Sequence, residues 1–173
     1  MRSAPSRVRA AQPADIPALM RLKRALAQGE NSLHAVRANA ADWLRDGFGA
    51  DAGFTAFVAE DAGNVIGMAT CSQRIITGWN GPVIFLQDLF VEPDYRAHGV
   101  ARALMARVAA HARDLGSPIV ELTVHADNPA QMFYLRHGFQ PLPQCLTYVL
   151  AGPALTALAE RDREQSEKLS LAG

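Results

Sequence analysis

The feature that most constrains the fold is an almost continuous apolar segment, residues 83–91, followed by a basic turn and a long helical pattern. Only Gln87 and Asp88 interrupt the run VIFLQDLFV, which suits a central strand covered on both faces rather than a half-exposed one. Adjacent side chains of a regular strand point to opposite faces, so we expect Gln87 and Asp88 to face opposite ways. A buried strand that leads through a turn into a helix predicts a crossover connection in a sheet flanked by helices.

Apolar periodicity and turn residues predict the other elements around this strand. The expected helices are one from about residue 16, capped by Asp15, one at 35–46 ended by Gly47, and others at 100–114, 128–138 and 153–168. The further strands expected are residues 7–13, 54–60, 65–74, 118–124 and 146–150. This order predicts a mixed α+β fold in one domain over residues 1–173, with a core of about 7–150 and an extra C-terminal helix of about 153–168.

Charge and hydropathy exclude several classes of partner. Among the 173 residues, 17 basic side chains balance 17 acidic ones, so no net field favours nucleic acid or an anionic membrane. The apolar stretches are too short to cross a bilayer, and the N-terminal segment has no apolar secretory core. We therefore expect a cytoplasmic protein without nucleic-acid or membrane partners.

The basic turn DYRAHGVAR lies where the apolar strand gives way to the long helix. A helix N-terminus carries unsatisfied amide N–H groups and the positive end of the helix dipole, and therefore binds anions. Small residues at Ala97, Gly99 and Ala101 allow a phosphate to approach that backbone, and Arg96 and Arg102 add positive charge. On spacing alone, a phosphate site and a simple tight turn with solvated arginines are equally favoured.

Two motifs resolve this choice by resemblance. The stretch LQDLFVEPDYRAHGVARALM resembles the central motif of the GNAT superfamily of acetyl-CoA-dependent N-acetyltransferases, whose [QR]-x-x-G-x-[GA] signature falls on residues 96–101. Downstream, NPAQMFYLRHGF is similar to the family's second motif, a short helix that carries Tyr134. The resemblance covers residues 83–139 and implies a central mixed, largely antiparallel sheet that is splayed at the cofactor site and flanked by helices.

The resemblance also implies roles for individual residues. The backbone of residues 89–91 would pair with the pantetheine arm of acetyl-CoA, residues 96–102 would cradle the pyrophosphate, and Tyr134 would protonate the leaving thiolate. The family's usual asparagine position falls on Asp127, with Asn128 one residue late. The residues assigned in this way to the cofactor are Leu89, Phe90, Val91, Arg96, Ala97, His98, Gly99, Val100, Ala101, Arg102, Asp127 and Asn128. For Tyr134, packing against Phe139 with a satisfied hydroxyl is the structural alternative.

The general base is the point at which this chain departs from the family. LQDLFV is similar to the LEDLFV of the branch that acetylates diamines and polyamines, where the glutamate deprotonates the amine through water. The corresponding residue here is Gln87, which cannot take a proton but can position a water. Glu92, at the strand end, is a further candidate base, whereas for Asp88 a buried structural role is favoured.

The implied activity is transfer of acetyl from acetyl-CoA to a primary amine of a small molecule, either a diamine, a polyamine or an amino-acid-like compound. The alternatives are a protein N-terminal or lysine acetyltransferase and a non-catalytic acyl-CoA sensor. Candidates for the acceptor site are Glu30 and Trp79, which lie in predicted loops. The histidines have no metal-ligand spacing, so no metal is expected. The C-terminal helix is a candidate contact for a homodimer.

Overall fold

The computed structural model describes residues 7–78 and 81–160, and the chain divides into two compact units, residues 1–123 and 124–173, which are described separately. The strands of the first unit are β1 (Arg7–Ala10), β2 (Thr55–Asp61), β3 (Asn64–Ile75), β4 (Pro82–Val91) and β5 (Ile119–Leu122). Its helices are α1 (Ile16–Gly29), α2 (Ala40–Phe48) and α3 (Val100–Asp114), with short 3-10 turns η1 (Pro13–Asp15), η2 (Leu33–Ala35) and η3 (Pro93–Tyr95). No described helix is long and apolar enough to cross a membrane.

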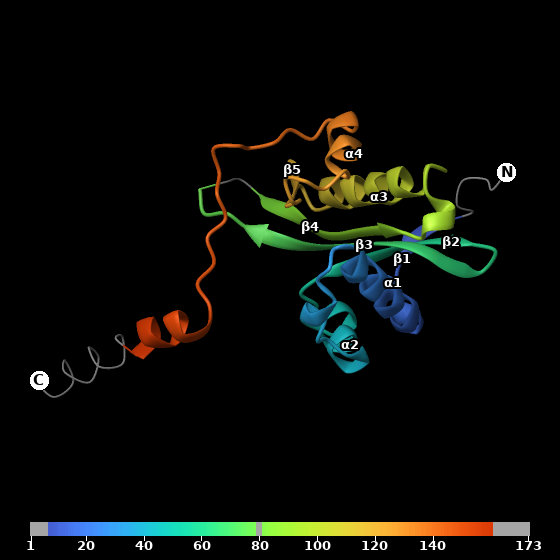
Figure 1. Ribbon diagram of the computed structural model, residues 1–173. Helices are drawn as coiled ribbons and strands as arrows, with labels where there is room; N and C mark the ends of the chain where they lie inside the picture. Colours follow the sequence, from blue (N-terminus) through green and yellow to red (C-terminus); the bar gives the residue numbers. More distant parts are fainter. Residues whose placement is uncertain (1–6, 79–80, 161–173) are drawn as a thin grey trace, which may run out of the picture. The chain divides into compact units, whose positions relative to one another are not determined.

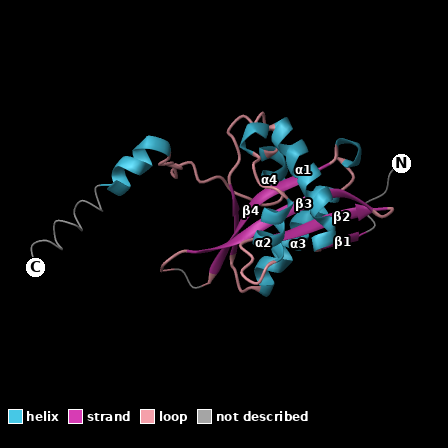
Figure 2. Cartoon of the chain, turned by 90° about the horizontal axis from the view of Figure 1, so that it is seen from below, coloured by secondary structure: helices cyan, strands magenta, loops and turns pink. Residues whose placement is uncertain are grey.

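The first unit is built on one five-stranded sheet in the order β1-β2-β3-β4-β5. Neighbouring strands are antiparallel from β1 to β4, and β5 joins β4 in parallel through the α3 crossover. Helix α3 covers one face of the sheet, and α1 and α2 cover the other (Figure 1). Figure 2, seen from the α1–α2 side, shows the strands lying side by side across the unit. The predicted mixed, largely antiparallel sheet with flanking helices is confirmed.

Apolar side chains of the helices fill both sides of this sheet. On α3, the row formed by Val100, Leu104 and Val108 is almost fully buried, as the helical spacing predicts. On α1, Leu19 and Leu22 are fully buried and belong to a core cluster with Trp43 of α2 and apolar residues of the strands. The helices are therefore held by their apolar stripes, and their polar edges remain available for a site.

A bulge interrupts β4 in its middle. Thr70 of β3 is paired with Asp88, but the next residue, Cys71, is paired with Leu86, so Gln87 has no partner on β3. Strand β5 pairs with β4 only over residues 83–86. Beyond the bulge, residues 88–91 have β3 on one edge and no described strand on the other.

Helix α2 begins and ends differently from the prediction. It starts at Ala40 because Asn39 caps it: the Asn39 side chain accepts hydrogen bonds from the amides of Ala41 (2.8 Å) and Asp42 (3.2 Å). Gly47 does not end the helix but lies within it. A Cβ at Gly47 would lie 2.5 Å from the ring of Phe54, so glycine is needed there for packing rather than as a stop.

Asp15 does not cap α1 as expected. Its carboxylate accepts hydrogen bonds from the amide of Gln12 (2.7 Å) and from the Arg9 guanidinium (2.6 and 2.9 Å), and makes no cap contact with α1. The hydrogen bond from Arg9 lowers the pKa of this carboxyl, against the opposing effect of burial. The residue thus fastens β1 to the start of the helical layer.

The second unit carries α4 (Gln131–Arg136), and residues 152–160 are also helical. The remainder of the predicted C-terminal helix, to residue 168, lies outside the described residues. The predicted strand at residues 146–150 is wrong, because this segment has no regular structure, and Tyr148 and Val149 are largely exposed. β-Propensity alone does not make a strand without a hydrogen-bonded neighbour.

Candidate active site

The turn between β4 and α3 has the backbone of an anion site. Ala97 (φ +61°) and Gly99 (φ +82°) both adopt left-handed conformations, and Gly99 is the N-cap residue of α3. No side chain of a described residue caps this helix end, so the amides of its first turn are open to an external acceptor. The position of a Cβ on Gly99 is also open, with its nearest neighbour, an Arg102 Nη atom, 4.0 Å away. The geometry suits a phosphate that approaches the backbone closely.

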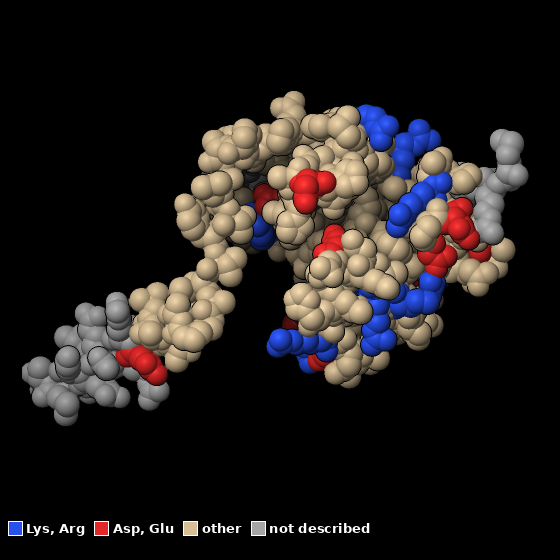
Figure 3. All heavy atoms as spheres, in the orientation of Figure 1, with Lys and Arg blue, Asp and Glu red and all other residues tan. Residues whose placement is uncertain are grey.

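The charged side chains of this turn play different parts. Arg96 is tied back to the sheet, since its Nε donates to the carbonyl of Val91 (3.0 Å) and its guanidinium lies 5.5 Å from the centroid of the Phe90 ring. His98 Nδ1 lies 2.6 Å from the carbonyl of Arg96. Arg102 has no hydrogen bond or ion pair with any described residue, so its charge is available to a ligand. Figure 3 shows basic side chains gathered over the N-terminal end of α3.

A cavity of about 440 Å³ lies beside the bulge of β4, and residues of α1 and α2 form part of its lining. It is lined by one residue of α1, the end of η2 and the segment after it, one face of α2, the residue before β2, residues of β3 and β4, and the residue after β5. The lining residues are Lys23, Ala35, Val36, Arg37, Ala38, Asp42, Trp43, Asp46, Phe54, Thr70, Phe85, Gln87, Asp88 and Thr123. Its mixture of aromatic, aliphatic and charged groups is that of a small-molecule site.

Gln87 and Asp88 both line this cavity, and the expectation that they face opposite ways is wrong. The bulge is the physical reason, because an extra residue in one strand breaks the strict alternation of side chains. A sequence pattern read as a regular strand cannot show this.

Asp88 is fixed between two neighbours at the floor of the cavity. Its carboxylate accepts hydrogen bonds from Lys23 Nζ (2.5 Å) and from Thr70 Oγ1 (2.9 Å), and its side chain is only 10% exposed. These contacts join α1, β3 and β4 at one point. The expected buried role of Asp88 is compatible with this geometry, but its partners are side chains and not the backbone.

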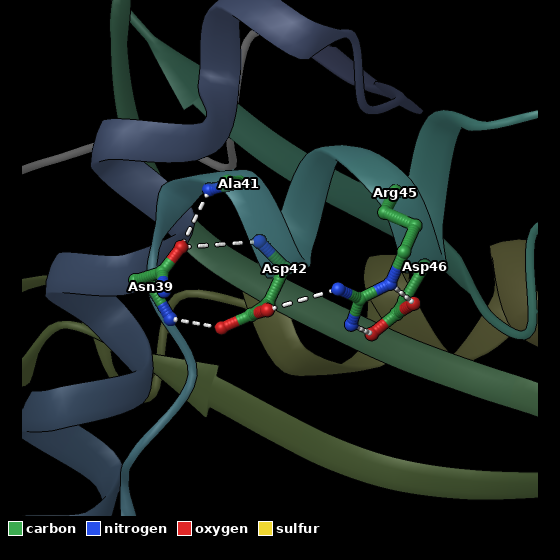
Figure 4. A network of polar contacts seen from close by, with 5 residues as sticks. All are labelled: Asn39, Ala41, Asp42, Arg45 and Asp46. Atoms are coloured by element: carbon green, nitrogen blue, oxygen red, sulfur yellow. Dashed lines mark hydrogen bonds and ion pairs between the residues drawn. The ribbon is translucent and has the colours of Figure 1, made fainter.

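Helix α2 and Phe54, the residue directly before β2, contribute aromatic and acidic groups to the cavity. The rings of Trp43 and Phe54 meet edge to face with centroids 5.3 Å apart. One turn of the helix presents Asp42 and Asp46, and the Arg45 guanidinium bonds to both, at 3.1 Å from Asp42 and at 2.6 and 2.7 Å from Asp46 (Figure 4). The hydrogen bond from Arg45 lowers the pKa of Asp46. Both acids are therefore paired before any ligand binds.

The other predicted polar candidates lie away from this cavity. Glu92 forms an ion pair with Arg21, whose guanidinium also donates to the carbonyl of Val65 (2.9 Å), and it is not a lining residue. Glu30 is an exposed residue at the C-terminus of α1 and lines neither this cavity nor a second one. Trp79 lies outside the described residues.

The second cavity, of about 620 Å³, lies along α1 and η2. It is lined by Pro17, Met20, Arg21, Arg24, Ala25, Gln28 and Leu33. It shares no lining residue with the cavity beside the bulge, and none of its residues belongs to β4. Position therefore favours the bulge cavity as the acceptor site.

In the second unit, Tyr134 is a half-buried residue of α4. Its ring packs edge-on against Phe133 and Phe139, with centroids 5.4 and 5.6 Å away. Asn128 Oδ1 accepts a hydrogen bond from the amide of Ala130 (2.9 Å), at the start of the α4 segment, while Asp127 is exposed. Within the described residues, no group of histidine, cysteine, aspartate and glutamate side chains could hold a metal ion.

Sequence reasoning missed most of the cavity lining, above all Lys23, Thr70 and Arg37. Lys23 directly follows the buried Leu22 and so lies at the edge of the apolar stripe of α1. This position in the sequence could have predicted that Lys23 is half-buried. Its partner Asp88 is 65 residues away in the chain, and only the packing of α1 on β4 brings them together.

Comparison with known proteins gives consistent results. The family model described as "Acetyltransferase (GNAT) family" matches residues 17–139. A thialysine N-epsilon-acetyltransferase of Mus musculus is 30% identical over 91% of this chain and 99% of its own length. A spermidine/spermine N(1)-acetyltransferase-like protein 1 of Homo sapiens is 33% identical over 59% of this chain, a match that spans 16% of that longer protein.

Solved structures show the same fold. An aminoglycoside N-acetyltransferase in complex with CoA has a TM-score of 0.63 and 25% identity, and the match covers 84% of this chain and all of that one (100%). An integron cassette protein from the mobile metagenome of V. cholerae superposes with a TM-score of 0.73 at 21% identity, over 88% of this chain and 96% of that one.

Proposed function

This chain belongs to the GNAT family and is an acetyl-CoA-dependent N-acetyltransferase, and we propose that its acceptor is the primary amine of a small molecule bound in the cavity beside the β4 bulge. The names of its relatives refer to small amines: thialysine, spermidine and spermine, and aminoglycosides. The observation that carries the proposal is the bulge, which brings Gln87 and Asp88 to one cavity at the point where β4 loses its neighbour β5.

The residues of the β4–α3 region fit the cofactor. The uncapped amides at the start of α3 and the free Arg102 suit a pyrophosphate, and the open edge of residues 89–91 suits an amide-containing arm that adds like a strand. Acetyl-CoA supplies the thioester whose acetyl group is transferred. Arg96 acts on the turn itself by fastening it to Val91 and Phe90.

The acceptor must lose a proton before it can react. An alkylammonium with a pKa near 10.4 requires about 4–5 kcal/mol to become neutral at pH 7. In this chain Gln87 positions the water that carries the proton away from the acceptor. Glu92 remains a weaker candidate because its carboxylate is already paired with Arg21.

The departing thiolate needs a proton in turn, and we assign it to Tyr134. A phenol is a suitable donor to a thiolate, and the aromatic contacts of Tyr134 with Phe133 and Phe139 fix the ring within its own unit. Asp127 and Asn128 remain proposed contacts of the cofactor arm. A cytoplasmic location and a homodimer remain predictions.

The test is a screen of primary amines against acetyl-CoA, with release of free thiol as the readout. We expect turnover with small amines and none with peptides that offer only an N-terminus or a lysine side chain. A Tyr134→Phe variant should turn over at least about 100-fold more slowly at unchanged acetyl-CoA affinity. Turnover with peptides alone would favour a protein acetyltransferase, and binding of acetyl-CoA without turnover of any acceptor would favour the sensor.

A further inference from the structure

Among the described residues, every carboxylate that lines the bulge cavity already has a cationic partner from this chain. Asp88 is paired with Lys23, and Asp42 and Asp46 share Arg45. The cavity is therefore not an acidic surface waiting for a polycation. An acceptor with a net charge of +2 or more would meet acids that are already paired and would be repelled by their cationic partners.

The group bound to Asp88 is itself a primary alkylammonium. Lys23 Nζ lies 2.5 Å from Asp88 Oδ1, and the Lys23 side chain is 32% exposed and lines the cavity on a flexible four-carbon stem. A carboxylate has about four acceptor sites, of which Lys23 and Thr70 use two. Lys23 thus shows where an ammonium binds, and its flexible stem allows it to yield that place.

One cation of the cavity has no counterpart. Arg37 is exposed, lines the cavity from the segment after η2, and forms no hydrogen bond or ion pair with any described residue. Its planar guanidinium matches a carboxylate in bidentate geometry. In the cavity, the ammonium of Lys23 therefore occupies the position beside Asp88, whereas the guanidinium of Arg37 has no anionic partner among the described residues.

We propose, on the basis of the function assigned above, that the acceptor is an amine that also carries a carboxylate, as an amino acid does. Its primary ammonium displaces Lys23 at Asp88, and its carboxylate binds Arg37. The ammonium then gives its proton to the water that Gln87 positions, and the neutral amine attacks the thioester. Lys23 is then an internal competitor for the ammonium position, and Arg37 determines specificity. Such an acceptor brings an anionic end to the unpaired cation, whereas a diamine brings only further positive charge.

The test compares free lysine with cadaverine, which is lysine without its carboxylate, and 5-aminopentanoate with pentylamine as a second matched pair. We expect the carboxylate-bearing member of each pair to have the higher kcat/KM, by about 5- to 10-fold for one charge-assisted contact at a partly exposed site. Equal or lower kcat/KM for the carboxylate-bearing members overturns the inference.

Arg37→Ala isolates the anion contact, because the side chain is exposed and its removal does not disturb the core. The substitution should lower kcat/KM for free lysine about 5- to 10-fold without lowering it for cadaverine. Arg24→Ala is the matched control: Arg24 is also exposed and unpaired among the described residues, but lines the other cavity, and its loss should change neither value. A parallel loss for both amines in Arg37→Ala contradicts the assignment.

Lys23→Met tests the competition directly. Removal of an internal competitor should lower KM for both amines, while acetyl-CoA affinity stays constant. A KM that is unchanged or raised shows that Lys23 only holds Asp88 in place, and it overturns this part of the proposal. The two levels of inference fail separately: turnover of carboxylate-free amines alone refutes only the acceptor class, whereas no turnover of any amine refutes the proposed function.

Discussion

The two halves of β4 differ although they form one strand. Residues 83–86 pair with β3 on one edge and with β5 on the other, and Val83, Ile84 and Leu86 are almost fully buried. After the bulge at Gln87, residues 88–91 keep β3 but have no described strand on the second edge. Both halves contribute buried side chains, including Phe90 and Val91 in the second half, but only the second half leaves one backbone edge open next to the turn that follows it.

This difference shows that one unpaired residue, rather than a change of element, separates the part of β4 that is paired on both edges from the part with an open edge. Backbone N–H and C=O groups that pair with a neighbouring strand have their hydrogen bonds satisfied, whereas those of an unpaired edge can form hydrogen bonds with a ligand. Substitutions of the buried residues of the first half should therefore reduce stability, whereas substitutions at the bulge and in the turn after the second half should reduce function.

The largest effect on stability is expected from Ile84→Ala in the first half. Ile84 is fully buried, and its truncation should lower the free energy of unfolding by about 2–5 kcal/mol through lost burial and a residual cavity. Urea denaturation measures this loss, with Gln87→Ala, at an exposed position, as the reference. A similar loss of stability in both variants would contradict the claim that Ile84 belongs to the core and that Gln87 does not.

Gly99→Glu should have the largest effect on function, in the turn that continues the second half. A glutamate there is strained at φ +82° and brings negative charge to the phosphate position, so the Kd for acetyl-CoA should rise at least about 100-fold. Calorimetry measures the affinity. Gly63→Glu is a matched control, since Gly63 has φ +81° in the β2–β3 turn, and it should bind acetyl-CoA normally. Equal affinities of the two variants would argue against the anion site.

Gln87→Leu tests whether the residue at the bulge serves catalysis rather than stability. Loss of the amide that positions a water should lower kcat about 10-fold, while acetyl-CoA affinity and stability stay close to those of the unaltered protein. Steady-state kinetics and thermal unfolding provide the two readouts. Gln73→Leu, at an exposed position paired with Ile84, should retain full activity. An unchanged kcat in Gln87→Leu would remove this residue from the mechanism.

A smaller loss of stability than that of Ile84→Ala is expected from Asp15→Asn, which removes a carboxylate with a structural role outside the bulge cavity. Arg9 lowers the pKa of Asp15 in the folded state, so the ion pair contributes stability above the unfolded-state pKa of about 3.9 and loses it as the pH falls through the folded-state value. The variant should be about 1–3 kcal/mol less stable at pH 7, and the difference should shrink toward pH 2. Denaturation at both pH values measures it, and a difference independent of pH would contradict the ion pair.

The sequence was informative wherever local pattern and burial agree. Helix α3 has the predicted bounds, and the buried strand and the basic turn follow from apolar runs and small residues. The motif that resembles the GNAT family made the fold predictable beyond these patterns. The strand at residues 146–150 failed because β-branched and aromatic residues indicate a strand only when a neighbour can pair with it.

The candidate site was predictable only on its cofactor side. Backbone features such as the open turn at Gly99 lie within a few residues of their sequence signal. The acceptor side depends on the bulge at Gln87, on Lys23 reaching Asp88, and on Gly47 accommodating Phe54. These are consequences of packing between distant segments, and no local pattern specifies them.

Hydrogen exchange of the protein with and without CoA is the most direct test of the difference between the two halves of β4. We predict that CoA protects the amides of residues 88–91 and 99–102 and leaves those of residues 83–86, which are already paired on both edges, unchanged. Protection that is absent from residues 88–91 and 99–102, or that falls on other parts of the chain instead, would contradict the assignment of the second half of β4 and its turn to the cofactor.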